Sequence, residues 1–242
     1  MRFFLLIVFV LFWDFSLAQK FHTSIAVSYG VSKYLSTNKE VSTNNSAVNN
    51  FGIGHYFSAT ISEEYYILNN TSIGIGLNYV NSKGNFTSPS LTNHSSIPEV
   101  HSGYLNVLTF NSLSLPLFFK VNTNKEITKG VYFYAGLGLS YFLTAKRSID
   151  FVTTYDSEPG KRDVSHIAKE NIKLKSQDDN KMGRIGMLGI GKNILIKNRV
   201  FYSEVKYSID LNNWTYPQIS DTESLSFDLK SQCLLVSIGV KI

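Results

Sequence analysis

The sequence has little cysteine, little charge and no long apolar run beyond its first residues. Its single cysteine, Cys233, excludes a disulfide framework and any zinc site built from cysteines. Charged residues make up 17% of the 242 residues, below the about 25% usual for soluble domains, and the net charge is +5. Basic and acidic residues are interleaved, as in 156–181, so nucleic-acid binding is not expected. Aromatic residues reach 14%, which excludes disorder because disordered chains lack them.

The only sustained apolar run lies at the amino terminus. Arg2 precedes the run Phe3–Trp13, and small residues follow up to Ala18. A charged residue, a short apolar segment and a small-residue cleavage site are typical of a secretory signal peptide. The run is shorter than the about 20 residues that a membrane-spanning helix needs. We therefore predict a signal peptide over 1–18 and an exported domain over 19–242.

The exported part alternates apolar residues with small or polar ones. In the last stretch, Leu234, Val236 and Ile238 alternate with Cys233 and Ser237. A period of two indicates β-strands with one apolar face. We count eight such segments, which lie at Phe21–Tyr34, Gly52–Ser62, Thr71–Ser82, Leu105–Asn122, Val131–Thr144, Met182–Ile196, Val200–Leu211 and Phe227–Ile242.

Alternation also fits a soluble β-sandwich, and three features favour a membrane barrel instead. The strands are longer than the 5–6 residues usual in globular proteins. Their connections alternate, with long ones near 35–51, 83–104, 145–181 and 212–226 and short ones between, as in outer-membrane barrels. The face opposite the large apolar residues carries glycine and serine, which suit the narrow interior of an eight-stranded barrel. We predict an all-β, eight-stranded antiparallel transmembrane up-and-down barrel.

The small-residue face also carries charged side chains. In a closed barrel these would meet in an internal polar network of Lys120, Glu204, Lys206, Asp210 and Lys241. A proline in mid-strand cannot donate to the ladder, so Pro116 is predicted to mark a β-bulge. Several aromatic residues lie near the expected strand ends, where they suit either interfacial girdles or the general enrichment of aromatic residues in strands: Tyr29, Tyr34, Tyr79, Tyr132, Tyr141, Trp214 and Tyr216.

The run Leu113–Lys120, followed by a turn and the glycine-rich Val131–Gly138, resembles small outer-membrane β-barrel proteins of Bacteroidetes. These proteins are often described as PorT-like, after a component that a secretion system of that phylum needs. The resemblance extends to the closing strand, Val236–Ile242. It implies an outer-membrane location and allows a role in secretion. The chain departs from such barrels at its end, because Ile242 stands where an aromatic residue is usual.

Two patterns in the sequence resemble sites that carry chemistry. Gly186–Asn193 nearly matches a phosphate-binding loop, but Asn193 replaces the metal-binding hydroxyl and no helix follows. His22 and Ser24 share the inward face of the first strand, and with Glu204 they suggest a lipid-modifying enzyme. Glu204 lies two strands away, which disfavours that triad. We therefore predict no catalytic, cofactor-binding or metal-binding residues and no cofactor.

The leading expectation is a non-enzymatic outer-membrane protein with a side-chain-filled interior. Its long loops, especially Ser148–Lys181, would contact surface partners. The alternatives are an accessory component of a secretion system and a lipid-modifying enzyme. Expected partners are outer-membrane lipid and other envelope proteins, with no nucleic acid, and a monomer is favoured.

Overall fold

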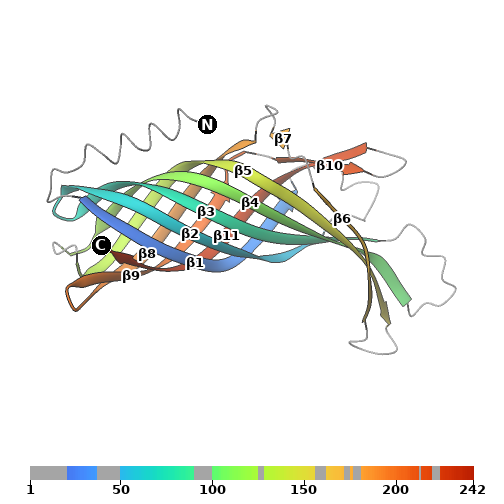
Figure 1. The fold of residues 1–242 in the computed structure, drawn as a ribbon, viewed down its shortest axis with the longest axis horizontal. Helices are drawn as coiled ribbons and strands as arrows, with labels where there is room; N and C mark the ends of the chain where they lie inside the picture. Colours follow the sequence, from blue (N-terminus) through green and yellow to red (C-terminus); the bar gives the residue numbers. More distant parts are fainter. Residues whose placement is uncertain are drawn as a thin grey trace.

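The computed structural model describes residues 21–36, 50–89, 100–124, 128–155, 162–171, 175–176, 181–212, 214–219 and 224–242. The predicted signal peptide lies outside these residues. Eight long strands form a barrel, as the sequence predicts (Figure 1). In barrel order they are β1 (Phe21–Ser36), β2 (Asn50–Leu68), β3 (Thr71–Pro89), β4 (Val100–Asn122), β5 (Gly130–Tyr155), β8 (Met182–Ile196), β9 (Arg199–Asp210) and β11 (Ser224–Lys241). No helix in the described part of the chain is long and apolar enough to cross a membrane.

The barrel closes because β11 pairs antiparallel with β1 over thirteen residue pairs. When paired residues are followed once around the barrel from Thr23, the path returns to β1 at Lys33. The stagger is therefore ten residues, since 33 − 23 = 10. Strand number and stagger together fix the radius, and an eight-stranded barrel is just wide enough for side chains to fill it.

The two faces of the wall have the character that the alternation predicts. Outward residues are apolar and exposed, as at Val27, Leu137 and Ile238. Inward residues of the same strands are buried and often small, as at Ser28 and Ser237, whose hydroxyl groups hydrogen-bond across the β1–β11 seam at 2.7 Å. The outward residues form a continuous apolar belt around the barrel, which suits a lipid environment.

Tight connections gather at one end of the barrel. Asn69 and Asn70 join β2 to β3, and Lys197 and Asn198 join β8 to β9. Lys197 and Asn198 both have positive φ, 46° and 65°, as a two-residue type I′ hairpin turn requires. β1 begins and β11 ends at this end of the barrel. The long connections therefore join the strands at the opposite end.

The long connections carry strands, which the sequence did not predict. β5 continues to Tyr155 and pairs there with β6 (Arg162–Asn171). β10 (Trp214–Ile219) pairs with both β11 and the short β7 (Lys175–Ser176). These elements extend beyond the barrel at its long-loop end (Figure 1).

The predicted bulge at Pro116 is wrong. β4 keeps one register through Pro116, where Leu115 pairs with Leu139 and Leu117 with Leu137. The proline fits without an extra residue because glycines lie beside it; a Cβ at Gly76 would come within 3.2 Å of the Pro116 ring.

The register shift of β4 against β5 lies elsewhere. Phe142 pairs with Ser112 and Thr144 with Asn111, which leaves Leu143 as the extra residue. A one-residue bulge reverses the faces beyond it. Thr144 therefore faces outward, whereas the sequence pattern had assigned it to the inward face.

Candidate functional site in the barrel lumen

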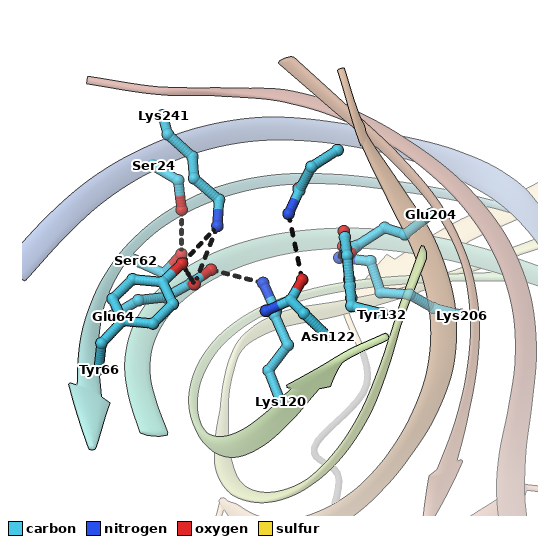
Figure 2. A network of polar contacts seen from close by, with 11 residues as sticks. Ser24, Ser62, Glu64, Tyr66, Lys120, Asn122, Tyr132, Glu204, Lys206 and Lys241 are labelled. Atoms are coloured by element: carbon cyan, nitrogen blue, oxygen red, sulfur yellow. Dashed lines mark hydrogen bonds and ion pairs between the residues drawn. The ribbon is translucent and has the colours of Figure 1, made fainter. Parts of the chain in front are cut away.

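The lumen contains a buried polar cluster near the tight-turn end, centred on Glu64 (Figure 2). Lys120 donates from Nζ to Oε1 of Glu64 at 2.5 Å, and Lys241 donates to Oε2 at 3.1 Å. The Tyr66 hydroxyl donates to the same Oε2 at 3.1 Å and accepts a hydrogen bond from Lys241 at 2.9 Å. The side chains of Glu64, Lys120 and Lys241 are at most 5% exposed. One carboxylate thus compensates two buried ammonium groups.

A second ion pair lies beside the first. Lys206 Nζ is 2.6 Å from Oε1 of Glu204, and the Tyr132 hydroxyl donates to Oε2 of Glu204 at 2.8 Å. Lys120 connects the two pairs, because its Nζ lies 4.5 Å from the centre of the Tyr132 ring. Cation–π contacts of this kind stabilise an ammonium group that has lost its water. The five charged side chains, three positive and two negative, fill one cross-section of the lumen.

The structure brings together four of the five residues named from the sequence. Lys120, Glu204, Lys206 and Lys241 lie in this cross-section, but Asp210 does not. Asp210 is six residues beyond Glu204 on β9, about 20 Å along the strand at 3.3 Å per residue. It instead accepts a hydrogen bond from the backbone N–H of Ser231 at 3.0 Å.

Sequence reasoning missed Glu64, because it ended the second strand at Ser62. The strand continues to Leu68, and its even-numbered residues face inward without interruption through Ser62, Glu64 and Tyr66. The same parity, carried two residues further, would have identified Glu64. Glu64 was missed because it lies close to the turn, where the alternating pattern of the second strand becomes unclear.

Aromatic side chains fill most of the remaining space. Tyr132, Tyr134 and Tyr202 pack together with Ala26 and with the partly buried Phe118 and Met187. Their rings lie over inward-facing glycines of the next strand: a Cβ at Gly191 would overlap the Tyr132 ring, and one at Gly189 would overlap Tyr134. Glycine is required at these positions by close packing.

This packing shows that three of the aromatic residues near the strand ends do not belong to an interfacial girdle. Tyr34, Tyr132 and Trp214 lie inside the barrel, at most 5% exposed, and only Tyr29, Tyr79 and Tyr141 are on the outer face. The side chain of Tyr216 lies outside those described. The three buried residues stand at inward positions, where neighbouring small residues leave room for a ring and where hydroxyl groups find partners. Aromatic residues that are buried in the lumen and aromatic residues that lie at the membrane interface both appear in the sequence as aromatic residues near strand ends.

At the long-loop end of the lumen, the Trp214 side chain is buried, with 4% of it exposed. Its ring packs edge-on against Phe142, with the ring centres 4.3 Å apart. Below it lies a cavity of about 50 Å³ lined by Asp210, Ser114 and Ser140 among others, and a second of about 60 Å³ adjoins the Glu64 cluster. These volumes hold a few water molecules each.

The residues considered for catalysis do not form a triad. Ser24 shares a hydrogen bond with Ser62 at 2.8 Å, and His22 packs edge-on against Tyr66. Glu204 is engaged by Lys206 and Tyr132, and no hydrogen bond joins it to His22 or Ser24 among the described residues. In the same part of the chain, no three His, Cys, Asp or Glu side chains gather as metal ligands. The near-match to a phosphate-binding loop lies within β8, as a strand.

Comparisons with known proteins identify the family of the chain. The structure is similar to neisserial surface protein A (14% identity; 92% of this chain and 97% of that one; TM-score 0.34) and to OprG of Pseudomonas aeruginosa (10%; 93% and 98%; 0.44). It is also similar to Ail of Yersinia pestis (12%; 93% and 100%; 0.39). No curated protein sequence matches significantly. The family model described as outer membrane protein beta-barrel domain matches residues 17–216, and the chain therefore belongs to this family of outer-membrane β-barrel proteins.

Proposed function

We propose that this protein is a non-enzymatic surface protein that contacts partners through the strands beyond its barrel. The observation that carries the proposal is the length of β4, β5 and β6. β5 has 26 residues, about 85 Å at 3.3 Å per residue, whereas a tilted strand spans the bilayer with about 9–11 residues. More than half of β5 is therefore available outside the membrane.

The extension is a hydrogen-bonded sheet with one register shift, between Ile149 and Asp150. Its outer part pairs with β4 on one side and with β6 on the other. A cross-strand contact between His166 and Asp150, 2.8 Å apart, links β6 to β5. Val164 and Ile167 on β6 are each more than half exposed. Long loops of outer-membrane barrels face the outside of the cell, so this sheet suits contact with other surfaces.

The filled lumen predicts in addition that the barrel does not conduct ions freely. In the described part of the chain, the Glu64 cluster fills one end of the lumen and Trp214 lies toward the other, and the two cavities found beside them measure about 50 and 60 Å³. The purified barrel in a planar lipid bilayer should therefore show no stepwise ion current. Regular current steps from the wild-type protein would contradict a closed interior.

The decisive experiment separates the extension from the barrel. Residues 148–169 are replaced by a short Gly-Ser turn, and insertion is checked by the faster gel mobility of the unheated protein. A strain carrying this trimmed barrel should show every defect of a deletion strain. A trimmed barrel that inserts and fully complements the deletion would overturn the proposal.

The two alternatives predict different defects. An accessory role in secretion, the finer meaning of the PorT-like resemblance, predicts loss of exported proteins in the deletion strain, and intact secretion would exclude it. A lipid-modifying activity predicts altered lipid A mass spectra in a Ser24→Ala strain, and unchanged spectra would exclude it.

A further inference from the structure

A row of hydrogen-bonded polar side chains lies on the outer face of the barrel, toward the long-loop end. Asn81 donates from Nδ2 to Oδ1 of Asn111 at 2.6 Å, and Asn111 donates from Nδ2 to Oγ1 of Thr144 at 2.7 Å. The Tyr79 hydroxyl donates to the same Oδ1 of Asn111 at 3.0 Å. Between this row and the tight-turn end, the outward residues of the same strands are apolar, including Leu77. The row therefore marks the edge of the apolar belt on β3, β4 and β5.

Two lysines stand directly beyond this edge. Lys83 on β3 pairs with Thr109 on β4, and Thr109 pairs with Lys146 on β5. Both lysines are exposed, and Thr109 is half-buried between them. Neighbouring strands are about 4.8 Å apart, so the two lysine backbones are about 10 Å apart. Their long side chains can converge on one group that lies above Thr109.

The ion pairs within the described part of the chain do not include these lysines, Lys83 and Lys146. Lys33 on β1 and Arg184 on β8 are also exposed on the outer face toward the same end. A positive surface at the edge of an apolar belt suits the anionic headgroup of a lipid whose chains lie against that belt.

We propose that Lys83, Thr109 and Lys146, with the Asn81–Asn111–Thr144 row beneath them, bind the phosphate of an outer-leaflet glycolipid. The two ammonium groups supply the charge, as lysine does for phosphate in many proteins. The hydroxyl of Thr109 and the amides below it hydrogen-bond the headgroup. The acyl chains then lie along the apolar outer residues of β3, β4 and β5. The site rests on the outer-membrane location of the chain and is independent of the proposed role of the β4–β5–β6 sheet.

The test measures binding of phosphorylated lipid A to the full-length mature barrel in detergent. Lys83→Gln should weaken binding about fivefold and the double change with Lys146→Gln about 30-fold, at the usual contribution of one lysine near an anionic surface. Lys192→Gln is the matched control, because Lys192 is also exposed on the outer face of β8 but lies toward the tight-turn end. It should bind as the wild type does, and gel mobility confirms that each variant is folded.

Lipid chemistry supplies the second arm. Dephosphorylated lipid A should bind at least tenfold more weakly than phosphorylated lipid A, and inorganic phosphate at millimolar concentration should not displace the lipid. Unchanged affinity in the double variant, an equal loss in Lys192→Gln, or equal binding of dephosphorylated lipid A would each overturn the proposal. Full displacement by inorganic phosphate would show a site for free anions and would overturn the assignment to lipid.

Discussion

Lys120 and Glu64 form an ion pair across a strand that lies between them. Their strands, β4 and β2, do not pair with each other, and β3 separates them in the barrel wall. They meet because the residues of β3 that pair with them are small: Gly74 pairs with Glu64, and Ser72 pairs with Lys120. Neither residue has a side chain large enough to separate the ammonium group from the carboxylate. The pair is therefore a product of barrel closure and of two small residues on a third strand.

Removing the charge of Glu64 should destabilise the barrel strongly. Glu64→Gln leaves two buried ammonium groups without a carboxylate, and breaking a buried pair in this way typically costs about 3–5 kcal/mol. Urea unfolding of the refolded protein, followed by gel mobility, measures the loss. Glu63→Gln is the control, because Glu63 is half-buried and its contact among the described residues is a hydrogen bond that it accepts from Thr23, so about 1 kcal/mol or less is expected. Equal losses in the two variants would contradict the central role of Glu64.

Replacing Glu64, Lys120 and Lys241 together by apolar residues should destabilise the barrel less than removing the charge of Glu64 alone. The triple variant Glu64→Leu, Lys120→Met, Lys241→Met removes all three charges together and keeps similar side-chain volumes. Apolar replacements of complete buried ion pairs are often neutral or stabilising. We expect its unfolding free energy to exceed that of Glu64→Gln by at least about 2 kcal/mol. A triple variant less stable than the single one would show that the hydrogen bonds, not the charges, dominate.

The glycines beneath the tyrosine rings should not tolerate a methyl group. Gly191→Ala would place a Cβ within the Tyr132 ring, and overpacking of this kind typically costs about 1–3 kcal/mol. Gly186→Ala on the same strand is the matched control, because its Cβ would meet only ordinary contacts, the nearest at 3.4 Å. Urea unfolding of both variants gives the comparison. Tolerance of alanine at Gly191 would mean that the ring is not held in place.

Trp214 should report on the long-loop mouth of the barrel. With the predicted signal peptide removed, it is the only tryptophan of the mature chain. Because Trp214 is 4% exposed, acrylamide should quench its fluorescence several-fold less in the folded barrel than in urea. Phe142→Ala removes the ring that packs against it and should increase quenching while gel mobility remains that of a folded barrel. Equal quenching in folded and unfolded wild type would show an open mouth.

The amino terminus allows a direct chemical check. If the segment 1–18 is a signal peptide, the protein recovered from the outer membrane begins at Gln19. Intact mass measurement of the purified protein reads this directly. A chain that retains Met1 or Phe3 would contradict the predicted cleavage.

The sequence alone determined the wall of this barrel. The side chains of a β-strand alternate between faces because of local backbone geometry, so the eight strands, their two faces and the belt could be read without a structure. The same alternation put Lys120, Lys206 and Lys241 on the inward face. It could not identify Glu64, which lies beyond the point where the pattern of the second strand becomes unclear.

The tertiary structure decided which inward residues meet. Contact across the lumen depends on the stagger accumulated over all eight strands, and this sum is not encoded in any one of them. It joins Glu64 to Lys120 and Lys241 and leaves Asp210 apart on the same strand as Glu204. The tertiary structure also decides that the bulge lies at Leu143 and not at Pro116. Whether a proline needs an extra residue depends on the space that residues of the adjacent strands leave for its ring.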